Sequence, residues 1–268
     1  MAHTIQPAFG RCQAKGLAAI LLSIGRYSPF NRGTLRMRLS KLILKANGGP
    51  IDITFRGGNF RVFDDSHPIE FGMMLYPAYN APELDFLTEH LRDGSVAIDL
   101  GANIGMFTIP MAVNAGPNGK VIAIDPSKAF QDKARFNAAA SGLSNIAFEN
   151  VAVGDADGRV NLQSVEGNPG TATVAEAQDG DTVMRPLLAL VQDHGVDRVD
   201  AMKVDIDGFE EKALAPFFQD CPDDLLPKRV VIEHILLEEQ DVTFIDMMLQ
   251  RGYKEVGRTR SNALFSIV

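Results

Sequence analysis

A glycine-containing segment near residue 100 has the composition of a cofactor-binding loop. Asp99-Leu-Gly-Ala-Asn-Ile-Gly105 follows an apolar run and opens a helical pattern. Gly101 permits a sharp turn and the close approach of a ligand to the backbone, and Gly105 permits close packing of the helix. Free N–H groups at the start of that helix favour a polar ligand. The segment therefore predicts a site for an adenosine-containing cofactor; the alternative is a tight turn with a structural role only.

The next acidic residue at a strand end is Asp125, 20 residues beyond Gly105. A carboxylate there can accept hydrogen bonds from both ribose hydroxyls, each worth about 1.5–3 kcal/mol before desolvation. NAD-binding proteins place an acid at the same position, so Asp125 indicates a nucleoside without choosing between cofactors. The alternative role is a helix cap ahead of Pro126 and Ser127.

The composition of the loop favours S-adenosylmethionine over a dinucleotide. The sequence between Gly101 and Gly105 lacks the middle glycine of G-x-G-x-x-G, which admits a pyrophosphate. S-adenosylmethionine has no pyrophosphate, and Asp99 can hold its ammonium group directly or through water. A nicotinamide-dependent oxidoreductase remains the competing enzyme class, and a cofactor-binding protein without activity is the competing non-enzyme class.

Polar side chains also end two later apolar runs. Asp205 and Asp207 follow residues 200–204, and Glu233 and His234 end the run that starts at residue 229. Ligands bind beyond the carboxyl ends of strands in open α/β sheets. S-adenosylmethionine carries a transferable methyl group, and its transfer to a hydroxyl would need in-line alignment and a base for the hydroxyl proton, which typically adds about 10²–10⁴-fold. We predict that Asp205 contacts the transfer site and that Glu233 or His234 is the base, because neighbouring strand residues point to opposite faces.

Structural alternatives exist for these residues. Asp205 could cap the next helix, Lys203 could be the buried partner of an acid, and His234 could lie at the sheet edge with its hydrogen bonds satisfied. Asp205, Asp207 and Glu233 are also hard oxygen ligands of the kind that Mg²⁺ prefers. Our prediction is that no metal is used.

The apolar pattern from residue 95 onward alternates between strands and helices. We predict strands at 95–100, 120–125, 146–153, 159–163, 200–205, 229–234, 253–258 and 262–268. We predict helices at 104–114, 127–140, 182–193, 209–217 and 242–251, and a loop at 167–180. Such alternation predicts an α/β fold with a doubly wound, mostly parallel sheet. The two final strands have no helix between them, so they are expected to pair antiparallel.

Several segments resemble the FkbM family of class I S-adenosylmethionine-dependent methyltransferases. Residues 96–108 are similar to the first motif of that class, and 150–155, 202–210 and 231–234 are similar to three further FkbM motifs, with Asp207 where the family commonly has glutamate. The resemblance covers about residues 70–268. It implies a seven-stranded sheet of order 3-2-1-4-5-7-6 with the last strand antiparallel, and methyl transfer to a hydroxyl on a sugar, polyketide or similar small molecule.

The loop, the spacing and the resemblance together give a set of predicted cofactor residues. We place the adenine near residues 150–152, and the segment before the first strand over the cofactor, as it often lies in the family. The predicted cofactor residues are Asp99, Gly101, Ala102, Asn103, Gly105, Thr108, Asp125, Ser127, Asn150, Val151, Ala152, Asp205, Tyr76 and Glu83.

Composition excludes several classes of protein. The 268 residues are 46% hydrophobic and 22% charged, which excludes collagen, a coiled coil and a mostly disordered chain. The two cysteines, Cys12 and Cys221, show neither disulfide-scaffold nor zinc-ligand spacing. No run of about 18 apolar residues is present, so we expect no spanning helix and a cytoplasmic location. The net charge of −8 argues against a nucleic-acid partner.

The charge is unevenly distributed. Residues 1–61 contain ten Lys and Arg and a single acid, Asp52. We expect helices at 12–25 and 34–46, a hairpin at 51–63 and a helix at 81–92. We accordingly divide the chain into a basic extension, 1–69, and a methyltransferase domain, 70–268. Residues 11–46 could lie on an anionic membrane surface, bind an anionic substrate or a partner, or pack on the acidic domain as a lid.

Overall fold

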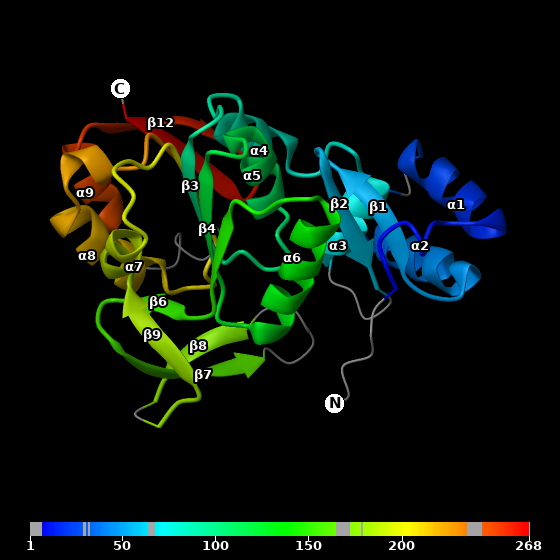
Figure 1. Ribbon diagram of the computed structural model, residues 1–268, viewed down its shortest axis with the longest axis horizontal. Helices are drawn as coiled ribbons and strands as arrows, with labels where there is room; N and C mark the ends of the chain where they lie inside the picture. The colour runs from blue at the N-terminus through cyan, green and yellow to red at the C-terminus, as the bar shows by residue number, and fades with distance from the viewer. Residues whose placement is uncertain are drawn as a thin grey trace. The chain divides into compact units, whose positions relative to one another are not determined.

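The computed structural model describes residues 7–28, 31, 33–63, 68–164, 172–177, 179–234 and 243–267 (Figure 1). The chain forms two compact units. Unit 1 comprises Met1–Ala81 and Phe136–Gly142, and unit 2 comprises Pro82–Arg135 and Leu143–Val268. The predicted domain boundary at 69/70 stays a prediction. None of the helices in the described ranges is long and apolar enough to cross a membrane.

A seven-stranded sheet forms the centre of unit 2. Its order is β12-β13-β11-β10-β3-β4-β5, with every neighbouring pair from β11 to β5 parallel and β13 antiparallel to both β11 and β12. This arrangement confirms the predicted doubly wound, mostly parallel sheet and its strand order. The strands are β3 (Val96–Leu100), β4 (Lys120–Ile124), β5 (Ile146–Glu149), β10 (Ala201–Val204), β11 (Arg229–Glu233), β12 (Tyr253–Arg258) and β13 (Asn262–Ile267).

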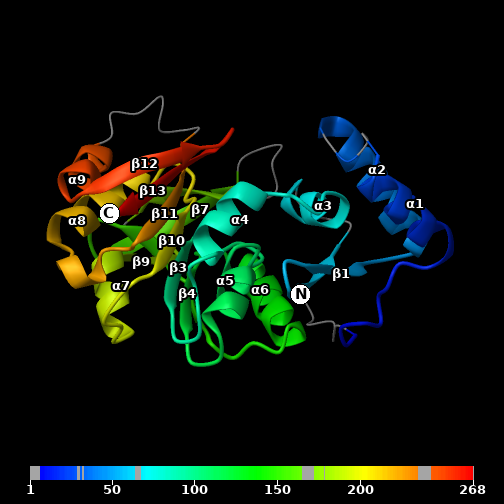
Figure 2. The same ribbon diagram turned by 90° about the horizontal axis from the view of Figure 1, so that it is seen from above.

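Helices cover both faces of this sheet. Figure 2 shows α4 and α5 on one side and α7, α8 and α9 on the other. Strands β3 and β10 are buried along their whole length, as expected of central strands covered on both faces. The helices are α4 (Ala81–Thr88), α5 (Thr108–Ala115), α6 (Lys128–Ala140), α7 (Leu187–Asp193), α8 (Glu210–Asp220) and α9 (Phe244–Gln250), with a 3₁₀ turn at Asp223–Leu225. Helix α6 contributes residues to both units.

Unit 2 also contains a four-stranded sheet that the sequence analysis did not predict. Its order is β6-β9-β7-β8. The strand predicted at 146–153 divides into β5 and β6 (Ala152–Gly154), which belong to different sheets. The predicted loop at 167–180 contains β8 (Ala172–Glu176), which pairs with β7 (Gly158–Ser164); residues 167–171 and 178 of that loop lie outside the described residues.

The helix predicted at 182–193 was wrong in its first half. Residues Thr182–Pro186 form β9, and only Leu187–Asp193 form α7. Thr182 and Val183 are β-branched and favour a strand. Pro186 has an extended backbone at the N-cap and lacks an N–H, so it ends the ladder and allows a helix to begin after it.

Within the described residues, unit 1 has three helices of its own and a hairpin, besides the end of α6. These are α1 (Gly16–Arg26), α2 (Gly33–Asn47), β1 (Ile51–Phe55), β2 (Gly58–Val62) and α3 (Pro68–Leu75). The hairpin and the two basic helices confirm the sequence prediction, whereas α3 was not predicted. The two-residue turn places both Arg56 and Gly57 at positive φ, which matches the right-handed twist of the flanking strands.

A buried ion pair holds the N-terminal segment of unit 1. The Arg61 guanidinium donates to both carboxylate oxygens of Asp52, at 2.7 and 3.0 Å, and also to the carbonyl of Pro7. Burial alone would raise the pKa of Asp52, but the bonds from Arg61 and from the amides of Cys12 and Gly10 hold this pKa below its ordinary value. The single acid of residues 1–61 is thus neutralised internally.

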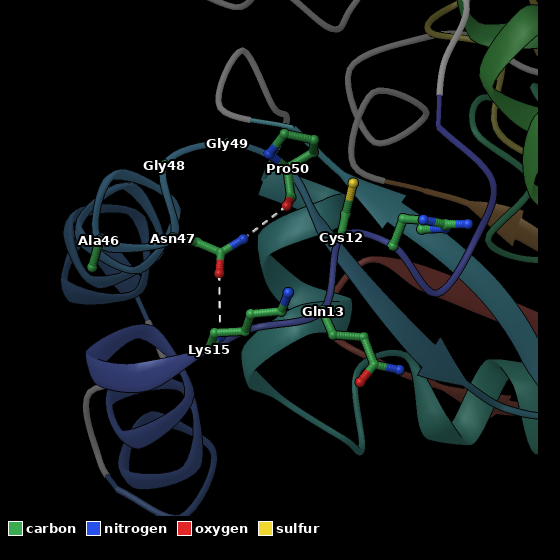
Figure 3. Close-up of a pocket in the computed structure, with 9 residues that line it drawn as sticks. Cys12, Gln13, Lys15, Ala46, Asn47, Gly48, Gly49 and Pro50 are labelled. Atoms are coloured by element: carbon green, nitrogen blue, oxygen red, sulfur yellow. Dashed lines mark hydrogen bonds between the residues drawn. The ribbon is translucent and has the colours of Figure 1, made fainter.

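A shallow cavity of about 240 Å³ lies between residues 11–15 and the turn after α2 (Figure 3). The Asn47 side chain joins the two segments, because its Oδ1 accepts from the Lys15 N–H and its Nδ2 donates to the Pro50 carbonyl. The cavity belongs to unit 1. All predicted cofactor residues except Tyr76 belong to unit 2.

Candidate functional site

The loop between β3 and α5 has three residues in the left-handed region. Gly101, Asn103 and Gly105 have φ values of 78°, 49° and 91°. A Cβ built on Gly101 would lie 1.8 Å from the carbonyl oxygen of Asp205. Gly101 is therefore required for the close approach of two backbone segments, a reason that the sequence did not show. The helix that was predicted to begin at residue 104 begins at Thr108, because the residues before Thr108 form the loop.

The Asp99 side chain is buried beside the loop. Its exposed fraction is 1%, and its Oδ2 accepts a hydrogen bond from the Thr108 hydroxyl. Burial raises the pKa of Asp99 to about 6. Its other oxygen, Oδ1, is buried and has no hydrogen-bond partner among the described residues. A buried carboxylate oxygen without a donor is a strong candidate to receive a ligand N–H.

Asp125 fixes the loop to the turn after β4. One of its oxygens accepts from the Asn103 N–H at 2.7 Å and the other from the Ser127 N–H at 2.8 Å. Burial raises the pKa of Asp125 to about 6. The Asn150 side chain donates to the carbonyl of Asp125, so it braces the same turn. Each Asp125 oxygen retains a second lone pair, and the carboxylate can still accept from ribose hydroxyls.

The ends of β10 and β11 bring three carboxylates together. Oxygens of Asp205, Asp207 and Glu233 all lie within 4.8 Å of one another; we call these three residues the acid group. Burial, and then the charge of Asp205, raise the pKa of Glu233 to about 8. Burial raises the pKa of Asp207 to about 6, again with a contribution from Asp205. The acid group is able to hold a proton near neutral pH, and its oxygens are also spaced to bind a cation.

Lys203 is a buried cation beside the acid group. It is 2% exposed, its Nζ is 3.5 Å from an Asp205 carboxylate oxygen, and it donates to the Val204 carbonyl. In the parallel ladder Lys203 pairs with Asp99, so one cation lies between the loop and the acid group. The suggested role of Lys203 as the buried partner of an acid is confirmed.

Glu210 holds the segment that carries Asp205 and Asp207. Its carboxylate accepts from the backbone N–H groups of Ile206 and Gly208, at 3.1 and 2.9 Å. Asp207 itself has a φ of 50°, so the chain turns sharply there. Glu210 in the first turn of α8 thus fixes the approach of the acid group to the loop.

Glu233 and His234 point to different surroundings. Glu233 joins the acid group, whereas the His234 Nε2 lies 3.4 Å from the carbonyl of Thr259, in the turn between β12 and β13. The expected alternation along the strand end is therefore present. Of the two candidate bases, Glu233 is the one beside Asp205.

The other predicted residues lie in several different elements. Glu83 is buried in α4 and accepts from the Thr259 hydroxyl and the Asn262 amide. These two partners were not predicted, because Thr259, after β12, and Asn262, at the start of β13, are remote from Glu83 in the sequence. Val151 and Ala152 lie where β5 ends and β6 begins. Tyr76 belongs to unit 1, and its role stays a prediction, as do the cofactor and catalytic roles of all these residues.

Residues 99–255 match the methyltransferase FkbM domain. The match spans more than half of the chain, and the chain belongs to this family of S-adenosylmethionine-dependent methyltransferases. Membership agrees with the interpretation that the loop favours S-adenosylmethionine over a nicotinamide cofactor.

Curated relatives match parts of the chain. The 23S rRNA (uracil(1939)-C(5))-methyltransferase RlmD of Shewanella sp. (strain MR-7) is 32% identical over 117 residues, 43% of this chain and 23% of RlmD. The protein-L-isoaspartate O-methyltransferase of Caenorhabditis elegans is 31% identical over 83 residues, 31% of this chain and 37% of that protein. The chain thus matches well under half the length of these relatives.

The chain is also similar to two solved structures. M. jannaschii TYW2 in complex with AdoMet has 14% identity and a TM-score of 0.41, covering 82% of this chain and 87% of TYW2. SMU.1697c of Streptococcus mutans in complex with SAH has 14% identity and a TM-score of 0.41, covering 69% of this chain and 94% of that protein.

The residues of unit 2 fit the family's cofactor. The partnerless buried oxygen of Asp99 suits an ammonium group, and the free lone pairs of Asp125 suit ribose hydroxyls. Asp99 lies in β3, just before the loop, and Asp125 directly follows β4, the neighbouring strand. Asp99 and Asp125 are therefore suited to hold S-adenosylmethionine, and this role stays a prediction.

Proposed function

We propose that the protein transfers the methyl group of S-adenosylmethionine to a hydroxyl of a small molecule such as a sugar or polyketide. The observation that carries this proposal is the acid group, in which Glu233 lies beside Asp205 and has a pKa of about 8. A group with a pKa near the working pH is well suited to remove a hydroxyl proton. Methylation of a thiolate or of a neutral amine would not need such a base.

S-adenosylmethionine, when bound, supplies a methyl group on a sulfonium centre. In our proposal Asp99 and Asp125 orient the cofactor, and the loop fixed by Gly101 and Asp205 holds it against the strand ends. The pair of Asp205 and Glu233 accepts the hydroxyl proton as the acceptor oxygen attacks. Lys203, 3.5 Å from Asp205, stabilises the negative charge of the pair before the proton arrives.

The test uses the full chain with S-adenosylmethionine that carries a tritiated methyl group. The acceptors are a panel of monosaccharides, glycosides, hydroxylated polyketides and matched carboxylic acids and amines. We expect label in products that resist alkaline hydrolysis, as methyl ethers do. Label found only in alkali-labile esters or in amines would overturn the proposal.

The same assay examines the assigned residues. We expect Asp205→Asn and Glu233→Gln to reduce turnover strongly, and His234→Ala to reduce it less. Glu255→Gln, at an exposed strand position of unit 2, is the matched control and should retain wild-type turnover. Wild-type rates in all three site variants would remove the assignment of the base while leaving family membership intact.

A further inference from the structure

Helix α1 of unit 1 exposes a row of aliphatic side chains. Leu17, Ile20 and Ile24 are 62%, 57% and 59% exposed. At about 100° per residue they lie within an arc of about 60° on one face of the helix. Tyr27, directly after the last turn, is 88% exposed. Single exposed aliphatic residues are common, but a row of them on one helix is characteristic of a surface that is covered in use.

The packing of α1 fixes the direction of this face. Ala18 and Gly25 are the buried residues of the helix. A Cβ on Gly25 would lie 2.9 Å from a Leu75 methyl and 3.0 Å from a Leu39 methyl, so α1 lies directly against α3 and α2 at this point. The helix cannot turn its aliphatic row inward without losing that contact.

Helix α2 exposes cations and further leucines. Arg38, Lys41 and Lys45 recur at helical spacing on its exposed side, and Leu42 is 52% exposed between them. Ile43 and Leu44 are buried on the other side. The part of the chain that the structure describes provides no ion-pair partner for these three cations. Long Lys and Arg stems can lie along apolar surface while their charges stay in water.

The charges of the segment favour an anionic partner. Residues 1–51 contain no acid at all, and the first acid, Asp52, is paired with Arg61. Interfaces between proteins are depleted of lysine, whereas helices that lie on membranes combine Lys and Arg with exposed Leu, Ile and aromatic residues. A tyrosine at the helix end, with an apolar ring and a polar hydroxyl, also suits the boundary between lipid and water.

We propose that α1 and α2 of unit 1 dock on a lipid bilayer with anionic headgroups. Leu17, Ile20, Ile24 and Tyr27 insert at the boundary of the headgroups, and Arg38, Lys41 and Lys45 bind the headgroup charges. This inference concerns unit 1 only, and it does not depend on the acceptor or on the acid group of unit 2.

The test is flotation of the full chain with vesicles. One set consists of phosphatidylcholine alone and the other contains about one third phosphatidylglycerol. We expect the protein to float with the anionic vesicles and to bind neutral vesicles at least about tenfold less. Binding should weaken as salt rises from about 0.1 to 1 M, because the screening length falls from about 10 to 3 Å.

Two sets of substitutions separate the apolar and charged contributions. Leu17→Ser, Ile20→Ser and Ile24→Ser combined, and Arg38→Gln, Lys41→Gln and Lys45→Gln combined, should each lower the bound fraction at least about tenfold. Leu249→Ser and Lys254→Gln, at exposed positions of unit 2, are the matched controls and should float as wild type does. Circular dichroism and binding of S-adenosylhomocysteine should be unchanged in all of them.

Three results would overturn the proposal. The first is a wild-type chain that does not float with anionic vesicles. The second is flotation that survives both sets of substitutions. The third is a dimer in analytical ultracentrifugation that the aliphatic substitutions dissociate while vesicle binding is absent, which would assign the surface to a second copy of the chain.

Discussion

Two groups of carboxylates at the carboxyl edge of the main sheet differ in what surrounds them. Asp99 and Asp125 adjoin the loop after β3, where the Thr108 hydroxyl and two backbone N–H groups meet their oxygens. In the acid group, burial and then the charge of Asp205 raise the pKa of both Glu233 and Asp207. Burial also raises the pKa of Asp99 and Asp125, so the groups differ in their neighbours: hydrogen-bond donors hold the first, whereas the carboxylates of the second face one another.

We interpret this difference as a division of roles: one group binds the cofactor, and the other reacts with the acceptor. Carboxylates that accept backbone N–H bonds fix the geometry of a turn and can position a ligand beside it. Carboxylates that share a small space hold a proton at neutral pH and release it when the surroundings change. We therefore expect substitutions in the first group to change cofactor affinity, and substitutions in the acid group to change turnover.

The largest expected effect is on turnover in Glu233→Gln. Gln has nearly the same shape but cannot accept the acceptor's proton, so kcat should fall by about 10²–10⁴-fold. The affinity for S-adenosylhomocysteine, measured by calorimetry, should change less than about threefold. A variant with wild-type kcat and weakened cofactor binding would reverse the roles assigned to the two groups.

The second-largest effect is expected for Gly101, where the loop contacts the backbone of Asp205. Gly101→Ala would place a Cβ 1.8 Å from the Asp205 carbonyl, and its φ of 78° is strained for alanine. We expect the free energy of unfolding to fall by roughly 3 kcal/mol or more, with loss of cofactor binding. Urea denaturation measures the change.

Gly195→Ala is the matched control for this substitution. Gly195 has a φ of 61°, also lies in unit 2, and has no atom within 4 Å of a built Cβ. Only the backbone strain remains there, about 1–2 kcal/mol. Equal losses in the two variants would show that the close approach to Asp205 adds nothing.

The sequence predicted the main sheet well because its central strands are buried apolar runs between recognisable loops. Val96–Leu100 is the clearest, since all five residues are buried. The four-stranded sheet was not predicted, because the residues of β9 are mostly half-buried or exposed and show no clear two-residue period. Its pairing depends on β6 and β7, which no local pattern in residues 182–186 reveals.

The candidate site was predicted in its residue types but not in its long-range contacts. Asp205 and Glu233 were expected to approach each other because both end parallel strands. The contact of Gly101 with the Asp205 carbonyl and the pairing of Glu83 with Thr259 depend on how remote segments pack. Such contacts produce no hydrophobic pattern along the sequence.

A smaller effect is expected on cofactor affinity in Asp99→Asn. The substitution removes the charge opposite the cofactor's ammonium group, and binding of S-adenosylhomocysteine should weaken roughly 10- to 100-fold. In the wild type, affinity should also fall as pH drops through about 6, because Asp99 and Asp125 then become protonated; Asp99→Asn should remove the part that is due to Asp99.

Thr108→Val is the control for Asp99→Asn. It removes only the hydroxyl that donates to the other oxygen of Asp99, so the charge remains. We expect it to weaken binding less than Asp99→Asn and to keep the dependence on pH. Calorimetric titrations at pH 5.5 and 7.5 compare the two variants. Identical pH profiles in wild type and Asp99→Asn would remove Asp99 from this role.

The acid group also predicts how stability depends on pH. The pKa of Glu233 is about 8 in the folded chain against 4.5 for the free side chain, so the folded state binds the extra proton between these values. The contribution of Glu233 to the free energy of unfolding therefore falls as pH rises from 4.5 to about 8. Glu233→Gln removes the effect. Its free energy of unfolding relative to wild type should rise between pH 5 and pH 9 by at most about 4 kcal/mol, and on the order of 2 kcal/mol after solvent screening of the partly buried carboxylate. Urea titrations of both chains at the two pH values measure it, and a constant difference would contradict the raised pKa.

The smallest expected effect is that of chelation. The spacing of the acid group suits a divalent ion, yet Lys203 already places a positive charge 3.5 Å from Asp205. A second cation would be repelled by that ammonium and would have to displace the proton held by Glu233. We therefore expect turnover after exhaustive treatment with EDTA to stay within about twofold of the untreated enzyme, with no gain on adding Mg²⁺. Loss of turnover that Mg²⁺ restores in the wild type, but not in Asp207→Asn, would instead make the acid group a metal site and Lys203 its competitor.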